Sequence, residues 1–165
     1  MGIALTLPIS SAALSIILGL SGLPAGAATV GCSAQMIGFA VASFRENKWD
    51  GLLAQGIGTS MLQISNIVKN PLIWIPPTLT SAILGPLATV VFQMENNPAG
   101  GGMGTSGLVG QIMTWQTMAG SRSAGLLLFQ ILLLHFILPA ILSLIFSEIM
   151  RKKGWIRFGD MKLNI

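Results

Sequence analysis

Three groups of polar side chains interrupt an otherwise apolar sequence and have the chemistry to bind a polar molecule. In the first group, Glu95 is followed by Asn96 and Asn97 at the end of an apolar stretch. A carboxylate or an amide can bridge neighbouring hydroxyls of a sugar with two hydrogen bonds. An ionisable group at bilayer depth costs roughly 2.5–3.5 kcal/mol on insertion scales, which favours a functional role for Glu95. The alternative is that Glu95 lies in the headgroup region and simply ends a helix.

The second group consists of Gln63, Asn66, Lys69 and Asn70. Spacings of three and four residues place most of these side chains on one face of a helix. Trp74 follows shortly afterwards, and its ring could stack on a sugar ring. The alternative is that these side chains form hydrogen bonds between helices, with Lys69 at the membrane interface.

The third group, Gln111, Trp115 and Gln116, repeats this combination of amides and an indole ring on a short apolar stretch. Together the three groups predict a substrate-binding site, and we assign no catalytic residue, no metal and no cofactor. The predicted members of the site are Glu95, Asn96, Asn97, Gln63, Asn66, Asn70, Trp74 and Gln111.

Three further features carry weaker chemical signals. Residues 102–107 spell G-x-G-x-x-G, but no strand precedes them and no βαβ unit fits here, so a dinucleotide site is not expected. His135 lies within an apolar stretch. It either transfers a proton or contacts the substrate, or it is a neutral imidazole that is hydrogen-bonded to a carbonyl. Cys32 is the only cysteine, which excludes an internal disulfide, and we expect it to pack in the core.

The overall composition is that of an integral membrane protein. Only 8% of the residues are charged, 52% are hydrophobic and the mean hydropathy is +0.75. A soluble domain has about 25% charged residues to cover its surface. The predicted fold is therefore an all-α integral membrane protein, with about five to six transmembrane or re-entrant helices and segments broken by Gly and Pro.

The net charge of +4 comes largely from the C-terminal tail. Basic clusters favour the cytoplasmic face of a membrane and its anionic lipid, and nucleic-acid binding is the weaker interpretation. Aromatic and apolar residues alternate with the charges, as in an interfacial segment. The basic residues of the tail are Arg151, Lys152, Lys153, Arg157 and Lys162.

Apolar stretches should position the polar groups. The first is broken near Pro8 and lacks the basic n-region of a signal peptide, so we interpret it as a membrane segment. Residues 45–50 should form a polar, water-exposed loop. Residues 51–68 carry too many polar groups to face lipid and should face protein or a cavity. The five stretches are 3–23, 26–44, 51–68, 71–94 and 124–149.

Prolines at two places should kink or break residues 71–94, because proline lacks the backbone N–H of a regular helix. They are Pro76-Pro77 and Gly85-Pro86. Nearby hydroxyls of serine and threonine can satisfy the carbonyl groups that are freed.

Residues 95–107 are rich in glycine and cannot form a regular helix. Irregular backbone at membrane depth persists only inside protein or beside a polar cavity, which a transporter or channel needs and a plain anchor does not. Residues 108–118 cover only about half a bilayer, which predicts a re-entrant helix or one arm of a helical hairpin. The sequence leaves open whether this segment crosses the membrane.

Two short strings occur twice. GIGTS at 56–60 resembles GMGTS at 102–106, and Pro-Ala-Gly occurs at 24–26 and at 98–100. Glycine-interrupted apolar segments in corresponding positions are typical of a midplane site built from broken helices. The alternatives are that small residues permit close helix packing, or that the matches arise by chance.

Residues 24–115, with the strings NPLIWIPPTL and MGTSGLVGQ, resemble the membrane-embedded EIIC component of a bacterial phosphotransferase system. More narrowly, they resemble the branch that includes the perfringolysin regulator-like membrane proteins. This resemblance implies a multi-pass protein of the bacterial inner (plasma) membrane that conducts a sugar, uses two re-entrant hairpins and forms a homodimer. A separate EIIB protein, charged from EIIA, would phosphorylate the sugar.

The resemblance also implies a role for one glutamate, because a glutamate beside a proline at a hairpin tip holds the sugar in related domains. Glu95, ahead of Pro98, is similar in setting but not in spacing. Relatives are roughly twice as long, so the chain resembles a C-terminal half that pairs with itself or with a second half. We divide it into a membrane-embedded EIIC-like domain, 1–150, and a basic cytoplasmic tail, 151–165. The alternatives to a permease are a membrane sensor or regulator without transport, or a half-length remnant.

Overall fold

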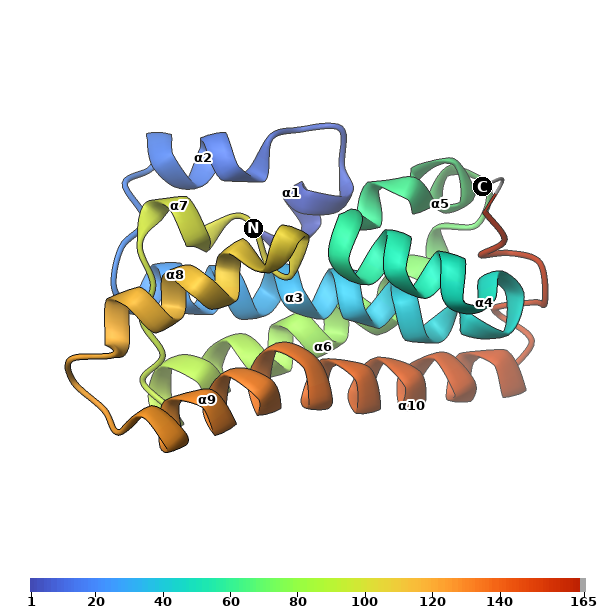
Figure 1. The fold of residues 1–165 in the computed structure, drawn as a ribbon. Coiled ribbons are helices and arrows are strands. Elements are labelled where there is room, and N and C mark those ends of the chain that lie inside the picture. Colours follow the sequence, from blue (N-terminus) through green and yellow to red (C-terminus); the bar gives the residue numbers. More distant parts are fainter. Residues whose placement is uncertain (164–165) are drawn as a thin grey trace.

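The structure, a computed structural model, describes residues 1–163 and is built from helices (Figure 1). Within this described part there is no β-strand, and a single isolated antiparallel bridge joins Gly22 to Asn96. Three helices are long and apolar enough to cross a membrane. These findings confirm the prediction of an all-α membrane protein with broken segments.

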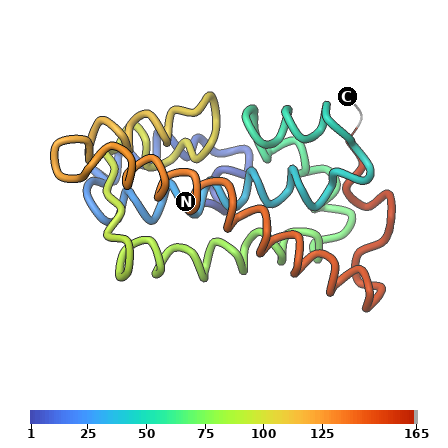
Figure 2. Tube along the Cα trace, turned by 60° about the horizontal axis from the view of Figure 1, so that its bottom comes forward, coloured from blue at the N-terminus to red at the C-terminus, as the bar shows by residue number. Residues whose placement is uncertain are grey.

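The three long helices form the frame of the molecule. The central one, α3, packs against both of the others, and 83% of its most apolar window is buried, compared with 33% for each of the other two. Figures 1 and 2 show α6 and α10 on one side of α3 and a layer of shorter helices on the other. The long helices are α3 (Leu23–Ala42), the run η3 (Pro71–Trp74), α6 (Ile75–Pro86) and η4 (Leu87–Val91), and the run α9 (Ala124–Leu132), η6 (Leu133–Ile137) and α10 (Leu138–Lys152).

The prolines do not end the second long helix, which runs from Pro71 to Val91, but the helix changes type near each of the two places where a kink or break was predicted. Pro76 and Pro77 lie in the first turn of α6, where backbone N–H groups have no helical partner. The hydroxyls of Thr80 and Ser81 donate to the carbonyls of these two prolines, both at 2.9 Å. Pro86 ends α6, and the helix continues as the π-helical turn η4.

The shorter helices form two hairpins that enter from opposite ends of the bundle (Figure 1). Hairpin 1 (residues 44–69) starts at the end where α10 finishes, which we call the C-terminal end. Hairpin 2 (residues 98–118) starts at the other, opposite end. Their elements are α4 (Phe44–Leu53), η1 (Ala54–Gly58), η2 (Ser60–Gln63) and α5 (Ile64–Lys69) in hairpin 1, and α7 (Pro98–Gly101), η5 (Ser106–Leu108) and α8 (Val109–Met118) in hairpin 2.

Residues 45–50 are helical and do not form the predicted polar loop. Arg45 pairs with Glu148 at 3.2 Å, and Glu46 pairs with Arg151 at 2.9 Å, so α10 neutralises two charges of α4. A kink at Lys48, where φ is 52°, turns the chain within this segment. The ion pairs to a neighbouring helix explain why a charged segment remains helical here.

Two short helices, α1 (Gly2–Thr6) and α2 (Ser11–Ile17), precede α3, and the chain breaks between them as the sequence predicted near Pro8. Two apolar clusters fill the two halves of the bundle. The cluster towards the opposite end contains Val30, Leu84, Ala88, Met94, Met118, Leu127, Ile131 and Leu134. The cluster towards the C-terminal end contains Phe39, Ala42, Ile67, Ile73, Met150, Ile156 and Met161.

Candidate functional site

The two hairpins meet beside α3, and their turns are the two similar strings at 56–60 and 102–106. The hydroxyl of Thr105 donates to the carbonyl of Gly56 at 2.6 Å, joining one turn to the other. Gly104 lies against α3, where an added Cβ would be 2.7 Å from the carbonyl carbon of Cys32. Cys32 is near the middle of the 20-residue helix α3, whereas Gly56 lies close to Ile37 and Ala40, so the two turns meet between the middle of this helix and its last turns.

Next to the turns is a layer of buried polar side chains around Gln35. Its amide nitrogen donates to the hydroxyl of Thr78 at 3.0 Å, and its carbonyl oxygen accepts from the indole of Trp74 at 3.1 Å. The hydroxyls of Thr6 and Ser60 are hydrogen-bonded at 2.9 Å, and Thr6 also lies 3.4 Å from the oxygen of Gln35. We call this set the central polar layer.

A second part of the central polar layer joins hairpin 2 to the third long helix. The amide nitrogen of Gln111 lies 3.0 Å from Nδ1 of His135 and 3.5 Å from the hydroxyl of Ser33. The carbonyl oxygen of Gln111 is buried and has no protein partner among the described residues. His135 lies in the π-helical turn η6, a distortion that is frequent at functional sites.

At the opposite end, Asn96 fixes the base of hairpin 2. Its amide nitrogen is within hydrogen-bond distance of Thr29 Oγ1 (2.7 Å), Thr114 Oγ1 (3.0 Å) and the carbonyl of Gly110 (3.1 Å). Asn96 is only 1% exposed. In this conformation the side chain of Asn96 holds hairpin 2 against α3 and is not free to bind a ligand.

The two neighbours of Asn96 differ from it. Asn97 accepts a hydrogen bond from the backbone of Gly100 at 3.0 Å and so caps α7. Glu95 is exposed to solvent and lines a cavity of about 280 Å³ at the base of hairpin 2. Glu95 therefore lies at the outer end of the hairpin and not at its turn.

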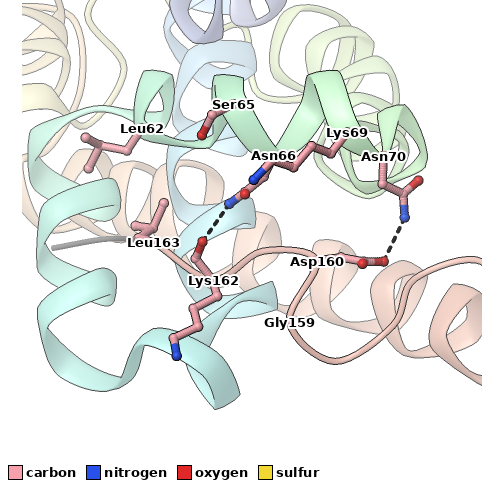
Figure 3. A pocket seen from close by; sticks show the side chains of 9 residues that line it. All are labelled: Leu62, Ser65, Asn66, Lys69, Asn70, Gly159, Asp160, Lys162 and Leu163. Carbon is pink, nitrogen blue, oxygen red and sulfur yellow. Dashed lines mark hydrogen bonds between the residues drawn. The ribbon is translucent and has the colours of Figure 1, made fainter.

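At the C-terminal end, the predicted amides contact the tail (Figure 3). Gln63 donates to the carbonyl of Met161 at 3.0 Å, and Asn66 donates to the carbonyl of Lys162 at 2.9 Å. Asn70 donates to the carboxylate of Asp160 at 2.7 Å. A cavity of about 390 Å³ lies between α5 and the tail and is lined by Leu62, Ser65, Asn66, Lys69, Asn70, Gly159, Asp160, Lys162 and Leu163.

The predicted site residues thus fall into three places along the bundle. Glu95, Asn96 and Asn97 lie at the opposite end; Trp74 and Gln111 reach the central polar layer; Gln63, Asn66 and Asn70 lie at the C-terminal end. They do not form a single pocket in this conformation. The sequence analysis missed Gln35, although it is the only amide side chain in α3 and could have been found on that ground.

The cations are distributed unevenly between the two ends. Of the nine Lys and Arg residues, Arg122 alone lies at the opposite end, beside Glu95. The other eight lie on α4, at the end of α5, at the end of α10 or in the tail (Figure 1). They are Arg45, Lys48, Lys69, Arg151, Lys152, Lys153, Arg157 and Lys162.

Comparison with known families identifies one match. The family described as "Phosphotransferase system, EIIC" matches residues 1–163. The match agrees with the predicted family, whereas the finer resemblance to the perfringolysin regulator-like branch stays a prediction. Searches of curated proteins and of solved structures gave no match.

Proposed function

We propose that this chain, which belongs to the EIIC family of the phosphotransferase system, binds a sugar between its two hairpins and passes it across the membrane. Membership of the family makes the chain a membrane component of a phosphotransferase-system permease. Such a component works with a sugar substrate and with EIIB and EIIA proteins. Sugar binding and translocation by this chain are the proposal.

The meeting of the two hairpins is the observation that carries the proposal. Irregular backbone and a layer of polar side chains are sheltered inside an apolar bundle, and at membrane depth such groups persist only inside protein or beside a polar cavity, as at a transport site. Broken segments that meet at the membrane centre from opposite sides are typical of a transport site. The contact between Thr105 and Gly56 closes the space between the two turns in this conformation.

The three groups of predicted residues then lie along one path. Glu95, with Asn96 and Asn97, would receive the sugar at one mouth, and the central polar layer with Gln111 and Trp74 would hold its hydroxyls. Gln63, Asn66 and Asn70 would line the other mouth, once the tail moves. A separate EIIB protein would phosphorylate the sugar there, while this chain presents the hydroxyl and contributes no phosphoryl donor.

The distribution of cations supports a direction for this path. Lysine and arginine near transmembrane ends concentrate on the cytoplasmic side. We therefore place the C-terminal end in the cytoplasm of a bacterial cell, with the chain in the inner (plasma) membrane and Glu95 on the outer side. Labelling of a single introduced cysteine at Lys153 by an impermeant maleimide should occur only from the inside.

We also propose that two copies of the chain, or the chain and a second half, pair along one apolar groove. The groove is lined by small residues of α1, α3 and α6, which permit close approach of another helix. Ala27→Trp would fill the groove and should abolish the dimer in chemical cross-linking. An unchanged dimer would contradict this surface. The small lining residues are Gly2, Ala27, Ala28, Gly31, Ser81 and Ala82.

The transport proposal is tested by uptake of radiolabelled sugars into vesicles that contain the chain, with and without EIIB. Uptake should depend on EIIB, and Glu95→Gln should abolish it while the protein remains folded. Glu148→Gln is the matched control, because Glu148 belongs to none of the three groups on the path and its ion pair is partly exposed to solvent, so uptake should be unchanged. Absence of uptake for every sugar would contradict transport.

A sensor or regulator without transport is the second candidate, and the docked tail favours it. The tail connects the base of hairpin 1 to the C-terminal end through Gln63, Asn66 and Asn70. A movement of the hairpins would therefore change the position of the tail, and with it the surface that is presented to cytoplasmic proteins. Sugar binding without uptake, together with altered gene expression after deletion of the tail, would identify this function.

A further inference from the structure

Arg122 stands out because it is the only one of the nine cations at the opposite end. A single arginine is not needed there for orientation, since the other eight cations already define the C-terminal end. Its side chain is half-buried and not free in solvent. The position of Arg122 must therefore be explained by its contacts with neighbouring residues.

The guanidinium holds the chain next to Glu95 in place. Nη1 of Arg122 donates to the side-chain oxygen of Gln130 at 2.6 Å, and Nη2 donates to the carbonyl of Gln93 at 3.1 Å. Gln130 is only 7% exposed, so one side of the guanidinium is anchored in the helix bundle. Two of the five N–H donors are used in this way, and the others remain available.

Gln93 adopts a backbone conformation that needs such a restraint. Its φ is 45°, in the left-handed region that residues other than glycine rarely adopt. Backbone strain of this kind persists only where the surroundings enforce it, and it clusters at functional sites. The hydrogen bond from Arg122 to the carbonyl of Gln93 is one of those restraints, and Glu95 follows two residues later.

Arg122 and Glu95 also face the same cavity. It has a volume of about 280 Å³ and is lined by Gln93, Glu95, Met118, Ser121 and Arg122. Among residues 1–163, neither charged group of this cavity forms an ion pair within 4.0 Å. The carboxylate of Glu95 and the free N–H donors of Arg122 thus line the same cavity without forming an ion pair with each other.

We infer that Arg122 and Glu95 form a loading site for a neutral, polyhydroxylated molecule at the outer mouth of the path. A hydroxyl group donates to the carboxylate and accepts from the guanidinium, so adjacent hydroxyls satisfy both. The two formal charges cancel, so the cavity as a whole favours neither a cation nor an anion, whereas a neutral polyol can satisfy both groups with its hydroxyls. The inference rests on the proposed function for its substrate class and adds Arg122 as a determinant of specificity.

The test uses labelling of a cysteine in the cavity, in the full-length chain in membrane vesicles. Ser121→Cys is introduced together with Cys32→Ala, and an impermeant maleimide labels the new thiol. D-glucose, N-acetyl-D-glucosamine, maltose and D-mannitol are added in turn. At a concentration about nine times its dissociation constant, at least one of them should slow labelling by about tenfold, because labelling falls by the factor 1 + [L]/Kd when the bound sugar covers the thiol.

Arg122→Gln and Glu95→Gln should each reduce this protection to about twofold or less, since each removes one side of the site. Arg122→Lys should also lose it, because lysine keeps the charge but not the planar fork. Lys152→Gln, which removes a cation from the other end, should leave protection intact. Glu95 is exposed, so Glu95→Gln tests the site even when Arg122→Gln does not fold.

Two results would overturn the loading site: protection by none of the four sugars, or protection that survives both glutamine substitutions. The readout is independent of transport. Protection without uptake would contradict the proposed permease and leave the loading site standing. Uptake without protection would support the permease and remove the loading site.

Discussion

Hairpin 1 and hairpin 2 share the G-x-G-T-S turn, but they are held against α3 in different ways. In hairpin 2, Gly104 has a φ of 54° and leaves no room for a Cβ beside Cys32. In hairpin 1, nothing lies within 4 Å of a Cβ built on Gly58, and the nearest atom to one on Gly56 is 3.6 Å away. The same short string therefore gives one tight turn and one loose turn.

The bases of the hairpins differ as well. The base of hairpin 2 is fixed by the buried amide of Asn96, which contacts α3 and α8, and by the hydroxyls of Ser11 and Thr29, which donate to the carbonyls of Gly102 and Gly100. Hairpin 1 is fixed by the tail and by the buried pair of Glu46 and Arg151. Hairpin 2 therefore has a rigid turn, whereas hairpin 1 has an adjustable turn on a base that the ion pair and the tail hold. The two G-x-G-T-S strings thus form the turns that meet, while the atoms packed around each turn determine how freely it can move.

The largest expected effect follows from breaking the buried pair at the base of hairpin 1. Glu46 has a side chain that is 0% exposed; it pairs with Arg151 at 2.9 Å and accepts from the backbone of Met161 at 2.8 Å. Glu46→Ala leaves Arg151 buried without its partner and should cost about 3–5 kcal/mol. Thermal unfolding of the purified protein in detergent measures the loss.

Glu148→Ala is the matched control, because its pair with the exposed Arg45 should contribute only about 0–1 kcal/mol. Limited proteolysis should also show earlier cleavage of the tail in Glu46→Ala. If both substitutions cost the same small amount, the buried pair does not hold hairpin 1, and the contrast between the two bases fails.

The next prediction compares the two turns directly. Gly104→Ala places a Cβ against α3 and forces a left-handed conformation on alanine, which should cost roughly 2–4 kcal/mol. Gly58→Ala is the corresponding change in hairpin 1, where φ is not positive and space is free. It should stabilise the protein by about 0.4–1 kcal/mol, because alanine loses less backbone entropy on folding.

Effects of opposite sign in thermal unfolding are therefore expected at two positions that are equivalent in the sequence repeat. Equal losses at Gly104 and Gly58 would mean that both turns are equally constrained. In that case hairpin 1 would not be the adjustable one, and the comparison would have to be abandoned.

A smaller effect is expected from the amides at the two bases. Asn96→Ala removes a buried side chain with three near acceptors and should cost about 2–3 kcal/mol. Asn66→Ala removes contacts to Gln63 and to the carbonyl of Lys162 and should cost about 1 kcal/mol. Chemical unfolding of the two variants measures the difference. A larger loss for Asn66→Ala would reverse the order proposed for the two amides.

Much of this arrangement could be predicted from the sequence, because membrane segments are dominated by local composition. The long helix that ends at Lys152, the break near Pro8 and the half-length helix α8 follow from hydropathy and from proline or glycine. The paired G-x-G-T-S strings indicated a site of broken helices, and the structure brings the two strings into contact beside α3.

What could not be predicted depends on partners distant in the sequence. Residues 45–50 read as a loop because the sequence does not reveal the pairing of Arg45 and Glu46 with α10. Pro76 and Pro77 read as a break because the start of α6 was placed too early. The role of Asn66 could not be foreseen either, since its acceptor is a backbone carbonyl of the tail 96 residues away.

The smallest effect concerns the central polar layer, where neither hairpin base is involved. Trp74→Phe removes the indole donor to Gln35, an interhelical hydrogen bond of 3.1 Å, and should cost about 0.6–1.7 kcal/mol. Trp115→Phe is the control, because Trp115 is 36% exposed and its indole has no hydrogen-bond partner among the described residues, so its loss should be near zero. Thermal unfolding distinguishes the two. If Trp115→Phe destabilises the protein as much as Trp74→Phe, the indole contributes by packing alone, and the layer around Gln35 is not held by its hydrogen bonds.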